Sequence, residues 1–308
     1  MTEEMATEVG PSRIEVAYER LGDPARPPVL LIMGAAGQLI NWPDGLCAEL
    51  VDRGLHLIRF DSRDTGRSTR FSDACPPDIR AAMAGDLSSA SYTLSDMAAD
   101  SVGLLDALGI GSAHVVGASM GGMIAQTIAI EYPGRIRSLT SIMSSTGDPD
   151  VGRSDPDAFG AAGPPPADRP GYIDWSVRSM RATGSPGFTF DEAAAAELAG
   201  RVYDRGFDLD GMMRQAVAVL ASGDRTARLR SLRLPTLVLH GTADRLFDIS
   251  GGQATAEAVP DAKLMTFDGM GHSLPRALWA TFADNIAEVV YRAEAGVGGA
   301  PVPNDSRP

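Results

Sequence analysis

Short apolar runs alternate along this chain with segments whose apolar residues recur at the spacing of a helix. This alternation restricts the folds that the chain can adopt. The strongest runs are Pro28–Met33, Leu55–Phe60, Ala113–Val116 and Pro235–His240. The segment Thr93–Leu108 repeats apolar residues at intervals of three and four, as an amphipathic helix does. Weaker strand patterns lie at Arg13–Tyr18, Ile136–Met143 and Lys263–Phe267. The sequence therefore predicts an α/β fold, a mostly parallel central sheet with helices on both faces.

One long segment interrupts the alternation. It is rich in Gly, Pro and Asp at Gly160–Gly171 and continues with two helical stretches, Glu192–Tyr203 and Met212–Ala221. The insertion follows the carboxyl end of a strand, which is the side where open parallel sheets bind ligands. We therefore expect a core of residues 1–144 and 230–295, an inserted helical cap of residues 145–229, and a disordered tail of residues 296–308.

Composition excludes several classes of function. Among 308 residues, 40 are Asp or Glu and 27 are Lys or Arg, a formal charge of -13, so the basic surface that nucleic-acid binding requires is missing. No apolar run has the length of a bilayer-spanning helix, and the start, MTEEMATEVG, is acidic where a signal peptide is basic. Cys47 and Cys75 are too few for a disulfide framework. We expect a soluble, cytoplasmic protein with no nucleic-acid partner and no membrane span.

A single hydroxyl, that of Ser119, lies in a glycine-rich segment between an apolar strand and a helical pattern. The segment reads AHVVGASMGGMIAQ and contains a Gly-x-Ser-x-Gly motif from Gly117 to Gly121. In this context only small neighbours tolerate the sharp, strained turn that presents the serine above the sheet. The following helix N-terminus favours negative charge that develops during attack on a carbonyl. The alternative is a serine that merely caps the helix, but the strand before it and the helix after it favour a nucleophile.

A serine hydroxyl is a weak nucleophile, so it requires a base and an orienting acid later in the chain. His272, in the loop GMGHSLP, is the expected base, because the other three histidines lie in strand patterns. Asp244, in HGTADRLF after a strand, is the expected acid, and Asp148, in STGDPD, is the alternative. The motif also predicts an oxyanion hole formed by the backbone N–H groups of Ala35 and Met120.

These motifs resemble those of the α/β-hydrolase family over almost the whole chain, from about residue 14 to residue 293. The segments MGAAGQLINW, FDSRDTGRS, HVVGASMGGMIAQ, HGTADRL and FDGMGHSLP are similar to those of anthracycline (aclacinomycin-type) methylesterases and related actinobacterial esterases and lipases. Many members of the family have a His-Gly pair directly before the residue that donates to the oxyanion. This chain has Met33-Gly34 at that place, and the anthracycline esterases also lack the histidine. The resemblance implies a triad of Ser119, Asp244 and His272, with Ala35 and Met120 as oxyanion donors, and a structural role for the turn DSRDTGRS.

The sequence thus predicts a serine esterase that cleaves carboxylic esters through an acyl-enzyme and needs no cofactor. Lys263 is the only lysine, and no His or Cys pair has the spacing of metal ligands, so neither a Schiff-base cofactor nor a metal is expected. The same residues suit a thioesterase or amidase, a C–C hydrolase or a cofactor-free perhydrolase. From another class, the alternative is a catalytically silent ligand-binding protein. The oligomeric state is expected to be a monomer or a homodimer.

Side chains near the expected site favour an uncharged ester as the small-molecule partner. The methionines are soft, apolar side chains suited to apolar or ring-bearing groups. They are Met120, Met123, Met143, Met180, Met212 and Met213. The alternative is a carboxylate site formed by arginines of the cap, which are Arg178, Arg181, Arg201 and Arg214.

Overall fold

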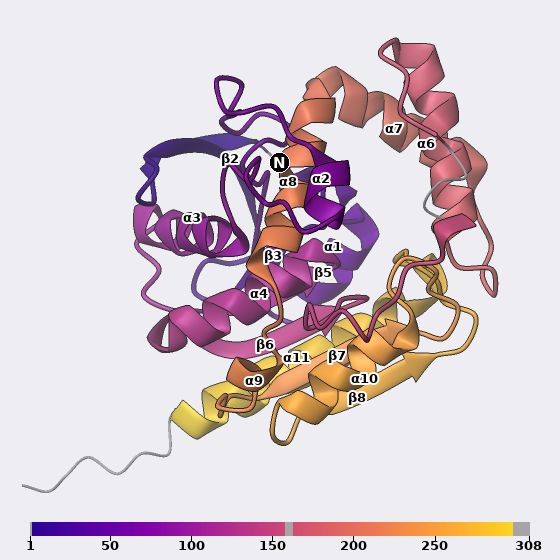
Figure 1. Ribbon diagram of the computed structural model, residues 1–308. Helices are drawn as coiled ribbons and strands as arrows, with labels where there is room; N and C mark the ends of the chain where they lie inside the picture. Colours follow the sequence, from indigo (N-terminus) through magenta and orange to yellow (C-terminus); the bar gives the residue numbers. More distant parts are fainter. Residues whose placement is uncertain (1, 158–162, 298–308) are drawn as a thin grey trace, which may run out of the picture.

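The computed structural model describes residues 2–157 and 163–297, and Figure 1 shows a central sheet with helices on both faces. Within these residues eight strands form the sheet in the order β1-β2-β4-β3-β5-β6-β7-β8. All pairs from β4 to β8 are parallel, whereas β1 and β2 are antiparallel to their neighbours. The strands are β1 (Glu4–Val9), β2 (Ile14–Leu21), β3 (Pro28–Ile32), β4 (His56–Phe60), β5 (Ala113–Ala118), β6 (Ile136–Ile142), β7 (Thr236–Gly241) and β8 (Lys263–Phe267). The predicted α/β fold is confirmed.

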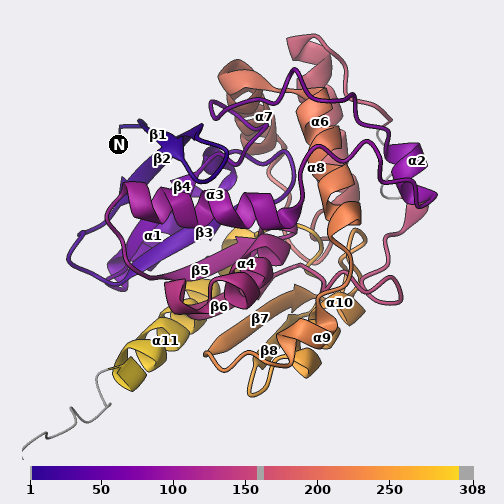
Figure 2. The same cartoon turned by 60° about the vertical axis from the view of Figure 1, so that its left-hand side comes forward.

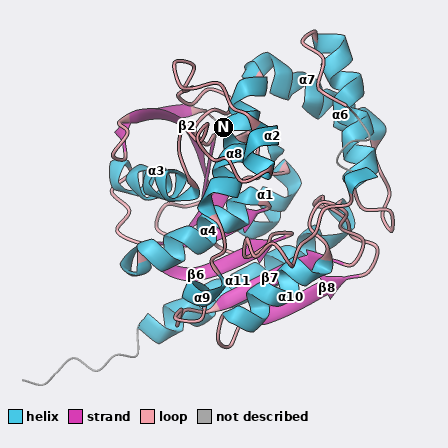
Figure 3. Ribbon diagram, in the orientation of Figure 1, coloured by secondary structure: helices cyan, strands magenta, loops and turns pink. Residues whose placement is uncertain are grey.

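Helices cover both faces of the sheet, as Figures 2 and 3 show from two directions. In chain order the helices are α1 (Asp44–Asp52), α2 (Ile79–Met83), α3 (Leu94–Ala107), α4 (Met120–Glu131), α6 (Arg169–Thr183), α7 (Glu192–Gly206), α8 (Leu209–Ser222), α9 (Thr226–Leu229), α10 (Ile249–Ala258) and α11 (Trp279–Val297). The buried side chains of α3 and α4 pack on one face, and those of α1 and α11 pack on the other. In the described part of the chain, no helix has the length and apolar character needed to cross a bilayer.

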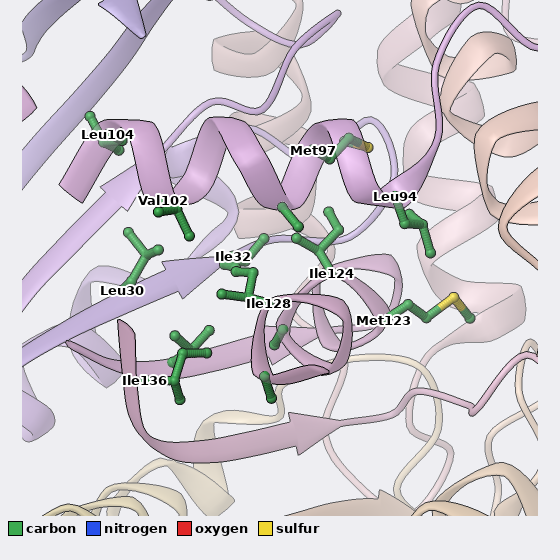
Figure 4. Close-up of a cluster of buried hydrophobic side chains, with 14 of the residues drawn as sticks. Leu30, Ile32, Leu94, Met97, Val102, Leu104, Met123, Ile124, Ile128 and Ile136 are labelled. Atoms are coloured by element: carbon green, nitrogen blue, oxygen red, sulfur yellow. The ribbon is translucent and has the colours of Figure 1, made fainter. Parts of the chain in front are cut away.

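The central strand β3 illustrates why the sheet is buried on both faces. Its side chains alternate across the sheet with period two. Leu30 and Ile32 join the cluster formed by α3 and α4, which Figure 4 shows, whereas Val29 and Leu31 join the cluster of α1 and α11. A strand buried on both sides needs an unbroken apolar run, and PVLLI supplies it.

The inserted segment lies between β6 and β7. Its helices α6 and α7 pack side by side (Figure 1), and α8 returns to pack beside α2 and α3. A small apolar cluster joins the insertion to the loop after β3, where Tyr172, Ala199 and Val202 contact Leu39 and Ile40. The insertion is thereby attached to the carboxyl ends of the strands, where the candidate site lies.

Some elements differ from the predicted ones. No strand was predicted at Glu4–Val9, because this edge strand has polar residues between its buried Ala6 and Val9 rather than an apolar run. The helix Arg169–Thr183 was also not predicted, since it begins inside the Gly- and Pro-rich segment and its buried face is narrow. α11 extends to Val297 and so includes the first two residues of the expected tail. The rest of that tail, residues 298–308, and residues 158–162 of the expected cap lie outside the described residues.

Candidate active site

Ser119 lies between β5 and α4 in a strained backbone conformation. Its φ of 57° and ψ of -124° are unusual for a residue with a side chain. The glycines around it allow this geometry because backbone approaches backbone there. A Cβ added to Gly117 would lie 2.0 Å from the carbonyl oxygen of Gly121, and one added to Gly121 would lie 2.0 Å from that of Ile32. The strand–serine–helix turn predicted from the sequence is present.

Three side chains that lie far apart in the sequence form one hydrogen-bonded chain. His272 Nε2 lies 2.9 Å from Ser119 Oγ, and His272 Nδ1 lies 2.8 Å from Asp244 Oδ2. A carboxylate can only accept, so Nδ1 carries the proton and Nε2 is free to accept from the serine hydroxyl. The structure therefore brings together the serine, the histidine and the aspartate that the sequence singled out.

The register of the sheet explains how these residues meet. Ser119 follows β5, Asp244 follows β7, and His272 follows β8. These strands are joined by parallel pairing through β6, so their carboxyl ends lie along one edge of the sheet. The loops that leave this edge carry the three side chains to the same point.

Asp244 is held independently of the histidine. Its Oδ1 accepts the backbone N–H groups of Leu246 at 2.9 Å and Phe247 at 3.0 Å, which leaves Oδ2 for His272. Asp148, the alternative acid, instead accepts the backbone N–H of Asp150 at 2.9 Å in a local turn. Of the two aspartates, the structure places Asp244 against the imidazole.

A second histidine, His240, lies behind the aspartate at the end of β7. It is fully buried, and its Nε2 lies 2.8 Å from the carbonyl oxygen of Phe247 and 3.8 Å from Asp244 Oδ2. A carbonyl oxygen only accepts, so Nε2 carries the proton, and burial lowers the pKa of His240. We interpret it as a neutral imidazole beside the carboxylate. Sequence reasoning treated His240 only as a strand residue, although its position four residues before Asp244 was a signal.

The loop after β3 faces the serine from the other side. Gly34 touches it so closely that an added Cβ would lie 2.9 Å from Ser119 Cβ. Gly37 N–H donates to Gly34 O at 3.0 Å, and the φ of Ala36 is 58°, the arrangement of a type II turn. Ala35, the second residue of this turn, is exposed, and its N–H donates to no acceptor within the described residues. Met120 is the first residue of α4, so its N–H has no partner within that helix.

Gln215 of α8 was not predicted and is fully buried. Its Oε1 accepts Ala36 N–H at 2.7 Å, and its Nε2 donates to Arg63 O at 2.7 Å and to Thr65 Oγ1 at 2.8 Å. One side chain of the insertion thus holds the loop after β3 and the turn DSRDTGRS together. The only sequence signal was the place of this glutamine directly before the apolar helical stretch AVAVL.

The turn DSRDTGRS binds the insertion through ion pairs. Arg214 donates to both oxygens of Asp64 at 2.9 Å, and Arg205 donates to Asp61 at 2.5 Å. Burial raises the pKa of Asp64, but the hydrogen bonds from Arg214 and from Phe71 N–H outweigh it, so the pKa lies below its usual value. These contacts agree with a structural role for the turn, and they occupy Arg214, one of the arginines considered for a substrate carboxylate.

The two cysteines and most of the potential metal ligands lie within the part of the chain that the structure covers. Cys47 is buried and Cys75 is exposed, and both are free thiols. Burial raises the pKa of Cys47 to about 11. Throughout residues 2–157 and 163–297, no group of three or more His, Cys, Asp or Glu side chains is placed to hold a metal ion.

Comparison with known proteins identifies the family. The profile of the alpha/beta hydrolase fold matches residues 27–275. The chain belongs to the α/β-hydrolase family. It is 30% identical to rhodomycin D methylesterase DnrP from Streptomyces peucetius over 285 residues, which cover 84% of this chain and 89% of that protein. It is 28% identical to rhodomycin D methylesterase DauP from Streptomyces sp. (strain C5), with the same coverage.

A solved structure confirms the fold over nearly the full length of this α/β-hydrolase. Esterase RhEst1 from Rhodococcus sp. ECU1013 superposes with a TM-score of 0.70 at 22% identity, covering 96% of this chain and 99% of that one. The resemblance to anthracycline methylesterases that the motifs indicated is confirmed by the two Streptomyces relatives. The relatives named here are esterases, and in this α/β-hydrolase Ser119, His272 and Asp244 lie in hydrogen-bond contact.

Proposed function

We propose that this α/β-hydrolase is a serine esterase that cleaves carboxylic esters through an acyl-enzyme. The observation that carries the proposal is the unbroken hydrogen-bonded chain from Ser119 through His272 to Asp244. The inserted segment, residues 145–229, is proposed to act as a cap over this site. No cofactor enters the mechanism, because the nucleophile, the base and the donors for the oxyanion all belong to the chain.

In the proposed mechanism His272 Nε2 takes the proton of Ser119 Oγ as the oxygen attacks the ester carbonyl carbon. The negative charge moves to the carbonyl oxygen, which accepts hydrogen bonds from the N–H groups of Ala35 and Met120. His272 then gives its proton to the departing alcohol oxygen, and the C–O bond breaks to leave the acyl-enzyme. Water attacks that ester with His272 again as the base, and the acid is released as Ser119 regains its proton.

Asp244 supports both steps without becoming protonated. Its Oδ2 holds Nδ1–H of His272, which selects the tautomer with a free Nε2 and stabilises the imidazolium that forms. The bonds from Leu246 N–H and Phe247 N–H keep the carboxylate in place. Phe247 also packs beside the imidazole, with ring centroids 5.8 Å apart, and limits how far the ring can tilt.

We propose uncharged esters with apolar or ring-bearing groups as substrates. Two of the four arginines considered for a carboxylate are occupied, since Arg214 pairs with Asp64 and Arg181 with Glu192. Met180, Met212 and Met213 are half-buried in the insertion, whereas Met123 belongs to the core. A relative of 30% identity is named a methylesterase, so methyl esters are the first natural type to test.

Hydrolysis of p-nitrophenyl esters tests the proposal. We expect the wild-type protein to release p-nitrophenol from acetate and butyrate esters, and Ser119→Ala to lose at least about 10³-fold in turnover, because the nucleophile is gone. Thioester, amide and free-carboxylate analogues in the same screen define the substrate class. Wild-type turnover by a correctly folded Ser119→Ala variant, checked by thermal unfolding, would overturn the proposal.

A further inference from the structure

The loop that carries His272 is bound to the inserted segment as well as to the core. We call residues 183–188, which run from the last residue of α6 toward α7, the connector, and residues 268–274 the histidine loop. Two backbone N–H groups of the histidine loop donate to the connector: His272 N–H to Thr183 O at 2.8 Å, and Gly271 N–H to Ser185 Oγ at 3.0 Å. The connector returns one bond, from Gly187 N–H to Gly269 O at 2.9 Å.

The two segments also pack without intervening side chains. A Cβ added to Gly271 would lie 1.9 Å from the carbonyl oxygen of Gly184, and one added to Gly187 would lie 2.8 Å from Gly269 Cα. Backbone contacts of this kind leave little freedom to slide. The position of the histidine loop therefore depends on the position of the connector.

The core holds the two ends of the histidine loop, since at its far end Trp279 Nε1–H of α11 donates to Leu274 O at 2.9 Å. Ala243 N–H donates to Met270 O at 2.9 Å, and Gly269 N–H donates to Thr242 Oγ1 at 3.1 Å. The next two backbone N–H groups after Met270, those of Gly271 and His272, both donate hydrogen bonds to the connector. The imidazole is thus carried by backbone that the insertion holds.

One hydroxyl of the connector reaches both neighbours of the histidine. Ser185 Oγ accepts the N–H of Gly271 at 3.0 Å and shares a hydrogen bond with Ser273 Oγ at 2.6 Å. Gly271 and Ser273 flank His272 in the sequence. No other side chain of the connector makes a hydrogen bond to the histidine loop among the described residues.

We propose that Ser185 is a positioning residue for His272, and that the insertion thereby takes part in assembling the active site rather than only covering it. The inference rests on the proposed function, since it concerns the base of that reaction. Proton transfer requires His272 Nε2 to stay within hydrogen-bond reach of Ser119 Oγ, now 2.9 Å. Without the Ser185 hydroxyl, the backbone on both sides of the imidazole gains freedom, and the productive geometry is less populated.

Kinetics of Ser185→Ala give the first test. We expect kcat for p-nitrophenyl butyrate to fall roughly 10-fold, the effect of about one lost hydrogen bond, while KM changes less than about 2-fold. Ser185→Thr keeps the hydroxyl and should retain most of the activity. Ser222→Ala is the matched control: Ser222 also belongs to the insertion and accepts a backbone N–H of the core, that of Leu94 at 2.8 Å, but outside the histidine loop. Its kcat should equal that of the wild type.

Ser273 approaches the same contact from the other side. Ser273→Ala removes the 2.6 Å contact to Ser185, so kcat should fall in the same direction but less. The double variant should be no slower than Ser185→Ala alone, because both changes act on one interaction. Additive losses would contradict the inference, and Ser273→Ala tests it even if Ser185→Ala fails to fold.

An NMR signal of His272 gives a readout that needs no turnover. The Nδ1 proton of His272 lies in the 2.8 Å hydrogen bond to Asp244 Oδ2, which slows its exchange with water. A looser histidine loop weakens this hydrogen bond, so the Nδ1–H signal should broaden in Ser185→Ala and keep its wild-type line width in Ser222→Ala.

The outcomes separate the two proposals. If the wild type cleaves no ester, or Ser119→Ala cleaves as fast, the proposed function fails whatever Ser185 does. If Ser119 is required but Ser185→Ala shows wild-type kcat and a wild-type Nδ1–H signal of His272, the positioning role alone is wrong.

Discussion

At the scale of single residues, the site depends on backbone conformations that most side chains avoid. Ser119 at φ 57° and Ala36 at φ 58° each occupy the left-handed region, which costs of order 1–2 kcal/mol for a residue with a Cβ. Both are held by specific neighbours, Ser119 by the tight packing of Gly34 and Gly117, and Ala36 by its hydrogen bond to Gln215. Small residues beside the serine are therefore a condition of the site's geometry.

Gly34→Ala tests this condition. The new Cβ would lie 2.9 Å from Ser119 Cβ and 3.4 Å from Ser119 Oγ, so the serine or the loop after β3 must shift. We expect kcat to fall about 10²-fold or more, because a displacement of about 1 Å at the reacting atoms has effects of that size. Gly111→Ala, where an added Cβ meets nothing within 4 Å, is the control and should be fully active. An active Gly34→Ala variant would show that the loop is not closely fitted to the serine.

The two aspartates provide a second prediction at this scale. Asp244→Asn replaces an acceptor of His272 Nδ1–H by an amide that can donate, which favours the wrong tautomer, so turnover should fall by about 10⁴-fold. Asp148→Asn should keep nearly all activity, since Asp148 Oδ1 accepts only a local backbone N–H. Steady-state kinetics of both variants decide the matter. The reverse ranking would assign the acid to Asp148.

At the scale of elements, the loops at the carboxyl ends of the strands were easier to predict than the contacts that hold them. The strand–serine–helix context of Ser119 and the positions of Asp244 and His272 after later strands are local patterns, so the sequence predicts them. The hydrogen bonds of Gln215 and Ser185 join residues far apart in the chain, up to 179 positions for Gln215 and Ala36. Such pairings depend on how the insertion packs on the core, and the spacing of apolar residues within one segment gives no information on that packing. The helix α6 was missed for a related reason, because its start lies in a segment rich in helix breakers.

Gln215→Leu tests the role of α8 as an element that joins the insertion to the core. The change keeps the side-chain size but leaves Ala36 N–H, Arg63 O and Thr65 Oγ1 without their buried partner. We expect the free energy of unfolding to fall by about 1–3 kcal/mol. Leu220→Gln, at an exposed position of the same helix, should change it by less than about 0.5 kcal/mol. Equal unfolding midpoints in urea for Gln215→Leu and the wild type would refute this prediction.

At the scale of the whole molecule, buried histidines make stability depend on pH. Burial lowers the pKa values of His56, His114 and His240, and that of His114 falls to about 4. An unfolded chain has histidines with a pKa near 6.5, so between about pH 6.5 and pH 4 it binds more protons than the folded protein. The stability contributed by neutral His114 is therefore present above about pH 6.5 and is lost as the pH falls toward 4.

His114→Gln isolates this contribution. The imidazole of His114 lies 2.8 Å from Ser138 Oγ and 3.1 Å from Glu294 Oε1, away from the serine, so the variant should remain active. From the shift of its pKa, the wild type should lose about 3 kcal/mol more than the variant between pH 6.5 and pH 4. Urea unfolding at a series of pH values measures the difference. Parallel curves for the two proteins would contradict the argument.

The central claim is that Ser119 is the nucleophile, and covalent labelling with a fluorophosphonate tests it most directly. The serine oxygen attacks phosphorus, fluoride leaves, and the adduct is stable because no water displaces the serine. Trypsin releases Ser119 in the peptide from Ala81 to Arg135, whose fragmentation spectrum locates the added mass. We predict one adduct per chain, on Ser119, and none in Ser119→Ala. An adduct on another residue, or an unlabelled protein that still turns over esters, would contradict the assignment.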